Sequence, residues 1–263
     1  MDDGRQPVWR FTDAIVRVPA KSAVNGLRAV DRGAPAMEGL IFEHATYVDA
    51  LRDAGVDVQM LPPLEEHPDS MFVEDPALVF PDCAIVLRPG APSRFGEADA
   101  IAPVLAERFE TVHRPHGPGF VDGGDVLLTD DCIFIGLSER TDRDGAEALA
   151  AVLEDTGRST RIVEPPPGVL HLKSACSLLD GDTILATGAM ARSGLFDGMN
   201  IVRVPSVEEA AANALRVNDV VFVGAEFPNT RLRVEEAGFQ VNAIPVAEVG
   251  KLDAGLSCMS LRW

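Results

Sequence analysis

A unit of about 45–50 residues recurs along this chain, and it constrains the fold more than any other feature. Each copy has two strand-like segments joined by a tight turn, then a helical segment and often another strand. The strand pairs lie at residues 71–89, 120–137, 170–188 and 212–224, the helical segments at 96–107, 142–156, 189–197 and 228–238, and further strands at 160–163 and 240–244. Self-similarity at this period predicts a propeller or a solenoid.

The two ends of the chain supply the pieces of a fifth copy. Residues 13–18 are rich in β-branched side chains and predict a strand. Residues 36–54 have apolar positions at helical spacing, and 56–61 predict a further short strand. The apolar C-terminal segment 256–263 would pair with 13–18 and complete this copy. We therefore expect one catalytic domain of five repeats spanning residues 1–263, with its last unit closed by the N- and C-terminal strands.

Polar or reactive residues occupy the same place in every copy, in the expected first strand of the strand pair. They are Glu74 with Asp75, Asp122, His171, Asn213 and Cys258. A charged group inside a strand is costly unless it is paired or used in chemistry. If the units surround an axis, these positions face one centre, where a thiol, an imidazole and carboxylates would form a nucleophile, a base and an orienting acid.

Each of these residues also has a purely structural interpretation. Cys258 could be a core thiol, because free cysteine is among the most buried residue types. His171 could be a hydrogen-bonded core histidine, and Asp122 a turn residue before two glycines. Asp75, which precedes a proline, could be a turn residue or a helix cap. Their shared place in the repeat favours the functional interpretation.

Two arginines stand at matching places after the second strands of their copies. Arg94 and Arg140 could bind a carboxylate together through bidentate hydrogen bonds. The alternative is that both are solvated loop residues.

Charge and composition exclude several classes of partner. The formal net charge is −18 and the isoelectric point is near 4.6, so we expect neither nucleic acid nor an anionic membrane as a partner. The chain has no apolar run of about 18 residues that could span a bilayer, and its acidic N-terminus does not resemble a signal peptide. Its four cysteines lie far apart, which favours a reduced, cytoplasmic protein. His113 and His116 lack partners at metal-ligand spacing, so no metal site is expected.

Five segments in this order resemble one known family. FVEDPALVF, RPGAPSR, DGGDVLLTDDCIFIGLSERT, LHLKSACS and KLDAGLSC are similar to the dimethylarginine dimethylaminohydrolases of the guanidino-modifying (pentein) superfamily. The resemblance runs from about residue 14 to residue 263. It implies an α/β fold, a five-bladed propeller of ββαβ units with pseudo-fivefold symmetry.

The resemblance also implies roles for individual residues. Cys258 would be the nucleophile, His171 the general acid and base, and Asp122 the residue that orients His171. The implied substrate contacts are Asp75 and Glu74 for the guanidinium group, Arg94 and Arg140 for the α-carboxylate, Asp69 and the backbone of Leu27 for the α-amine, and the backbone of Leu252 and Asp253 for the amino-acid portion.

The implied activity is hydrolysis of Nω-methylated arginines to citrulline and methylamine or dimethylamine, through a covalent thiouronium on Cys258. The substrate is a small cationic amino acid, no cofactor or metal is needed, and the protein is a monomer or a homodimer. Three alternatives remain open. One is an arginine deiminase or another guanidino hydrolase of the same superfamily. The others are a non-catalytic propeller that serves as a binding module, and a metal-dependent hydrolase.

Overall fold

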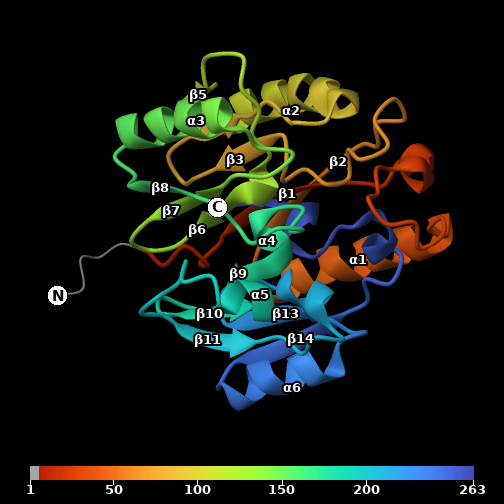
Figure 1. The fold of residues 1–263 in the computed structure, drawn as a ribbon. Coiled ribbons are helices and arrows are strands. Elements are labelled where there is room, and N and C mark those ends of the chain that lie inside the picture. The colour runs from red at the N-terminus through yellow and green to blue at the C-terminus, as the bar shows by residue number, and fades with distance from the viewer. Residues whose placement is uncertain (1–5) are drawn as a thin grey trace.

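The computed structural model describes residues 6–263. Within that range, five three-stranded sheets are arranged with the longer helices on their outer sides (Figure 1). In each sheet the middle strand pairs antiparallel with one neighbour and parallel with the other. A helix connects the two parallel strands, as such a crossover requires. This is the ββαβ unit that the repeat predicts.

Four of the units are continuous in sequence. The first contains β3 (Ala77–Val79), β4 (Ala84–Val86), α2 (Phe95–Arg108) and β5 (Val112–His113). The second contains β6 (Val126–Leu128), β7 (Ile133–Gly136), α3 (Arg143–Asp155) and β8 (Thr160–Val163). The third contains β9 (Cys176–Leu178), β10 (Thr183–Ala186), α5 (Gly188–Ala191) and β11 (Asn200–Arg203). The fourth contains β12 (Leu215–Val217), β13 (Val220–Gly224), α6 (Pro228–Glu236) and β14 (Gln240–Ile244).

The fifth unit joins the two ends of the chain. Strand β1 (Asp13–Arg17) pairs in parallel with β2 (Asp57–Leu61), and helix α1 (Met37–Asp53) connects them. Strand β15 (Leu261–Arg262) pairs antiparallel with β1, so that Ala14 lies opposite Arg262. The predicted closure of the last unit by the terminal strands is confirmed, and with it the five-unit propeller-like fold.

The strands and the outer helices together form the core. Every residue of β3, β4 and β7 is buried, as expected for short strands covered on both faces. Helix α3 buries Ala146, Leu149 and Leu153 against the sheets, and Asp142 caps its first turn by accepting a hydrogen bond from Gly145 N at 2.7 Å. No helix within residues 6–263 is long and apolar enough to cross a membrane.

The first strands of the units are shorter than the sequence predicts, and this changes where the polar residues lie. The predicted strands from residues 120 and 170 begin only at Val126 and Cys176. Ahead of them the chain forms a 3-10 turn, η3 (Gly123–Asp125), and a short helix, α4 (Leu172–Ala175). Asp122 and His171 stand at the N-terminal ends of these turns, not inside strands as predicted. The physical reason is that the strand positions are buried on both sides, whereas a turn offers backbone N–H groups to polar side chains.

Three further differences concern the secondary structure itself. The helix predicted at 189–197 is only the short α5, and its sheet gains β11, which the sequence did not indicate. The two-residue strand β5 was likewise not predicted.

Candidate active site

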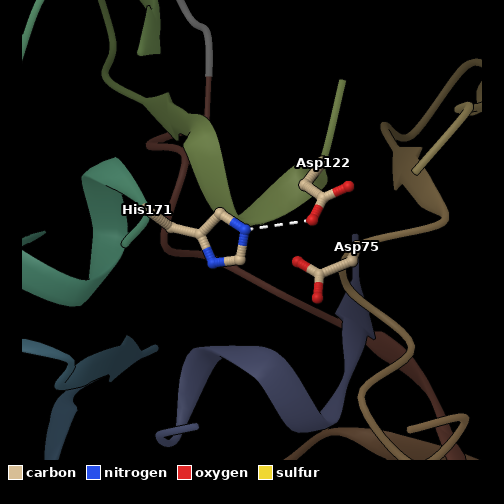
Figure 2. A group of neighbouring side chains, drawn as sticks. All are labelled: Asp75, Asp122 and His171. Carbon is tan, nitrogen blue, oxygen red and sulfur yellow. Dashed lines mark hydrogen bonds and ion pairs between the residues drawn. The ribbon is translucent and has the colours of Figure 1, made fainter. Parts of the chain in front are cut away.

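The turns that precede three of the first strands place three polar side chains together (Figure 2). Asp75 precedes β3, Asp122 precedes β6 and His171 precedes β9. Each offers one ligand atom within 4.8 Å of the others, a spacing that would also suit a metal ion. The arrangement places an imidazole beside two carboxylates, so it can hold and transfer a proton.

His171 and Asp122 form a buried pair. His171 Nε2 lies 3.0 Å from Asp122 Oδ2, with 13% of the histidine side chain and none of the aspartate side chain exposed. The second oxygen of Asp122, Oδ1, accepts a hydrogen bond from Gly90 N at 2.7 Å, and Asp122 N donates to Thr141 Oγ1 at 3.1 Å. Since both carboxylate oxygens and the backbone are held, Asp122 presents a fixed acceptor to the imidazole.

The charges around His171 favour its protonated form. Burial disfavours the imidazolium, but the hydrogen bond to Asp122 and the charges of Asp75 and Asp125 outweigh burial and raise the pKa of His171 to about 9. His171 is therefore an imidazolium near pH 7, which is the form a general acid needs.

Asp75 lies beside this pair because two glycines make room and donate hydrogen bonds. Asp75 Oδ1 accepts from Gly124 N at 3.0 Å, and its other oxygen is paired with Arg94. A Cβ atom on Gly124 would lie 2.9 Å from Asp75 Oδ1 and 3.0 Å from His171 Nδ1, so these side chains would have to shift to accommodate it. Burial raises the pKa of Asp75, but Arg94 and His171 outweigh it and hold that pKa below its usual value. Asp75 is thus an anion at the centre of the cluster.

Arg94 is a buried part of this cluster. Its Nε and Nη2 bind Glu97 at 3.0 and 2.7 Å, its Nη1 binds Asp75, and Nη2 also donates to Phe72 O at 2.9 Å. Glu97, the third residue of helix α2, is not among the site residues predicted from the sequence. Every guanidinium nitrogen of Arg94 already has a partner in the chain, so its contact with a substrate carboxylate stays a prediction.

Arg140 differs from Arg94 in its surroundings. It is half-buried, and no partner within residues 6–263 bonds to its guanidinium group. Its backbone packs so closely on Gly90 that a Cβ there would lie 2.4 Å from Arg140 O. Its charge also acts on the buried carboxyl of Asp69. Of Arg94 and Arg140, it is therefore Arg140 whose guanidinium group is available to a ligand.

Glu74 points to other partners than its neighbour Asp75 does. Its carboxylate is buried and binds Lys173 Nζ at 2.6 Å, Ser257 Oγ at 2.8 Å and Arg262 Nη2 at 3.4 Å. Its predicted contact with a guanidinium group is untested, and three groups of the chain already neutralise or bind its charge.

Cys258 lies in the 3-10 turn η6 (Ser257–Met259), which precedes β15. The residue is half-buried, and its Sγ accepts from Gly255 N at 3.5 Å and Asn213 Nδ2 at 3.6 Å. Burial, with the charges of Glu74 and Asp75, raises the pKa of this thiol to about 12. The charge of Asp75 therefore acts on both Cys258 and His171.

The remaining predicted residues surround the turn 26–33 and the segment before Cys258. Asp69 is buried and its Oδ1 accepts from Leu27 N at 2.9 Å. Burial raises the pKa of Asp69, while Arg94 opposes the shift. Leu252 is buried, and Asp253, which has a left-handed backbone (φ 53°), binds Arg32 at 2.9 Å. Their backbone contacts with a substrate stay predictions.

Asp125 is a site residue that the sequence analysis missed. It is fully buried, with Oδ1 accepting from Leu172 N at 2.9 Å and Oδ2 accepting from Ser138 Oγ and Thr141 Oγ1 at 2.7 Å each. It thus ties the turn that carries His171 to the loop that carries Arg140. A signal was present, since Asp125 is a second acid in an apolar segment beside two glycines.

Comparisons with known proteins identify the family of this chain. A model of the arginine deiminase family matches residues 101–206. A dimethylarginine dimethylaminohydrolase of Pseudomonas aeruginosa is 40% identical over 96% of this chain and 100% of its own length. One of Streptomyces coelicolor is 32% identical over 95% of this chain and 96% of its own. A solved structure of the Pseudomonas aeruginosa enzyme, a cysteine-to-serine variant in complex with citrulline, superposes with a TM-score of 0.94 at 38% identity, covering 97% of this chain and 100% of that one. The chain belongs to the dimethylarginine dimethylaminohydrolase family.

Proposed function

From membership in this family, we propose that the protein hydrolyses asymmetric dimethylarginine and monomethylarginine to citrulline and dimethylamine or methylamine. The observation that carries the proposal is the cluster of Asp75, Asp122 and His171, with Cys258 influenced by the same Asp75 charge. The complex of a 38% identical family member with citrulline supports citrulline as the product.

The substrate guanidinium would bind next to Asp75. Asp75 is a buried anion fixed by Gly124 N and Arg94, so it can accept N–H donors from a cationic group. We assign the main contact to Asp75 instead of Glu74, because Glu74 already binds two cations, Lys173 and Arg262, whereas Asp75 binds one, Arg94.

Binding of a cation would also activate the nucleophile. The negative charges of Glu74 and Asp75 contribute to the raised pKa of the Cys258 thiol. A guanidinium group beside Asp75 offsets that charge and favours loss of the thiol proton to solvent, which leaves the thiolate, the reactive form. The thiolate then attacks the guanidinium carbon and forms a tetrahedral adduct.

His171 would handle the protons of both steps. As an imidazolium it gives its proton to the departing dimethylamine, which leaves a thiouronium on Cys258 and a neutral imidazole. The neutral imidazole then takes a proton from the attacking water, and citrulline and the free thiol result. Asp122 keeps the ring oriented through both steps.

The amino-acid end of the substrate would lie toward Arg140 and Asp69. The Arg140 guanidinium would bind the α-carboxylate, with Arg94 as the second predicted contact, and Asp69 with the backbone of Leu27 would bind the α-amine. Leu252 and Asp253 would contact the same portion through their backbone.

The direct test is steady-state citrulline release from dimethylarginine, monomethylarginine and arginine. We expect kcat/KM to be highest for a methylated arginine, unchanged by a chelator, and lost in Cys258→Ser with the fold retained. A preference for arginine would identify an arginine deiminase, the alternative that the match of residues 101–206 to that family supports.

A second measurement addresses the covalent step. Incubation with a haloamidine should add mass to Cys258 and to none of Cys83, Cys132 and Cys176. An adduct on another cysteine would contradict the mechanism. The four cysteines are free thiols, which supports our proposal of a cytoplasmic location.

A further inference from the structure

We propose that Asn213 is a catalytic residue of this site, whose side-chain amide donates a hydrogen bond to Cys258 Sγ and stabilises its thiolate. The proposal rests on the proposed function, because it assumes that Cys258 is the nucleophile. Asn213 belongs to the fourth unit of the fold, whereas the other reactive groups of the site belong to the other four units.

The position of Asn213 in the fold matches that of the other site residues. It ends the 3-10 turn η4 (Glu209–Ala212), two residues before strand β12. Asp75 stands two residues before β3, and Cys258 three before β15. The equivalent turn of each unit thus carries one polar or reactive side chain toward the centre.

The contacts of Asn213 fix which of its atoms faces the sulfur. Its Oδ1 accepts a hydrogen bond from Ser257 N at 3.0 Å, while its Nδ2 lies 3.6 Å from Cys258 Sγ. If the amide were turned over, Nδ2 would face the Ser257 N–H, and two donors would oppose each other. The backbone of the nucleophile's own turn therefore holds the amide with its N–H toward the thiol.

The chain packs around this contact with little freedom. A Cβ atom on Gly255 would lie 2.5 to 2.7 Å from the side-chain atoms of Asn213, so only glycine fits there. Gly255 is also the residue whose N–H reaches Cys258 Sγ at 3.5 Å. The same close approach thus brings two donors to one sulfur.

A donor is needed here because the other neighbours of the sulfur oppose its ionisation. Burial and the carboxylates of Glu74 and Asp75 disfavour the thiolate, whereas Lys173 favours it. Hydrogen bonds to the charged form offset that penalty. Within residues 6–263, Gly255 N and Asn213 Nδ2 are the hydrogen-bond donors to Sγ, and Asn213 is the one supplied by a side chain.

The test compares Asn213→Asp with Asn213→Leu. The aspartate keeps an oxygen for Ser257 N but loses the N–H to Sγ, whereas leucine loses both. We measure the rate of Cys258 alkylation by iodoacetamide from pH 7 to 10, read at that residue by mass spectrometry. Removing a hydrogen bond to a charged group should lower the rate about tenfold at each pH in Asn213→Leu, and by more in Asn213→Asp, whose carboxylate also opposes the thiolate. Asn200→Asp, which adds a charge on the exposed strand β11, should alkylate at the wild-type rate.

Wild-type alkylation in Asn213→Asp would overturn the proposal, because it would leave Asn213 only the structural contact with Ser257. Should Asn213→Leu fail to fold, as judged by circular dichroism, the aspartate variant decides alone. In turnover, kcat should fall with KM little changed. Alkylation does not need a substrate, so wild-type inactivity toward dimethylarginine would refute the proposed function while the alkylation rates still test Asn213.

Discussion

Replacing Asp122 by asparagine removes the negative charge that stabilises the protonated form of His171. The carboxylate serves two donors at once, Gly90 N through Oδ1 and His171 Nε2 through Oδ2. Asparagine offers a single oxygen, so its amide N–H must face either the backbone N–H or the imidazole. In both cases the ionic partner of the imidazolium is lost.

The expected magnitude follows from the pKa of His171. That pKa is raised from 6.5 to about 9, and the hydrogen bond to Asp122 is the largest favourable cause. A return to 6.5 would lower the protonated fraction at pH 8 from about nine-tenths to about 3%, so kcat at that pH should fall about thirtyfold. The alkaline limb of the pH–kcat profile should move toward lower pH by between one and about two and a half units.

The same shift predicts how stability changes with pH. A raised folded-state pKa stabilises the protein fully below pH 6.5, and this contribution is lost as pH rises through 9. Asp122→Asn should therefore lower the free energy of unfolding by up to about 3 kcal/mol near pH 6, and by much less near pH 10.

The assays are citrulline release from pH 6 to 10, the NMR titration of the His171 ring and chemical denaturation at pH 6 and 10. Glu208→Gln is the matched control, since Glu208 is also a buried carboxylate, but it binds Asn229 and Thr230 away from the site. An alkaline limb and a His171 pKa at wild-type values in Asp122→Asn would refute this reasoning.

Four more substitutions test separate parts of the site. Gly124→Ala places a Cβ 2.9 Å from Asp75 Oδ1, so kcat for citrulline release should fall at least about tenfold. An unchanged kcat would show that Asp75 can shift without loss of activity. Asp125→Asn should lower the pKa of His171 in an NMR titration and reduce Tm, because a charge and a fully bonded buried acceptor are lost; no change in either would contradict its positioning role. Arg140→Gln should raise KM with Tm unchanged. Arg94→Gln should instead lower the free energy of unfolding by about 3–5 kcal/mol, because it leaves Asp75 and Glu97 unpaired. Equal unfolding curves for the two variants would contradict the conclusion that Arg94 is structural and Arg140 is not.

Much of the fold could be predicted because its signals are local. Turn pairs such as Asp130-Asp131, together with the apolar strands around them, recur at a fixed period, and five copies imply a ring that the terminal strands close. The pairing of β15 with β1 confirms that inference. The sequence predicts strand starts that are too early, because a polar residue beside a strand has no local signal that distinguishes a turn from the end of the strand.

The sequence by itself determined which residues could meet, since their shared place in the repeat makes Asp75, Asp122 and His171 neighbours in a ring. Only the tertiary structure decided what each side chain binds. It directs Glu74 to Lys173, pairs Arg94 with Glu97 inside the protein, and turns the Asn213 amide toward Cys258. The physical reason is that these directions depend on turns from different units approaching within hydrogen-bond distance. That approach depends on the absence of a side chain at glycines such as Gly90 and Gly124, whose neighbours lie in other units of the fold.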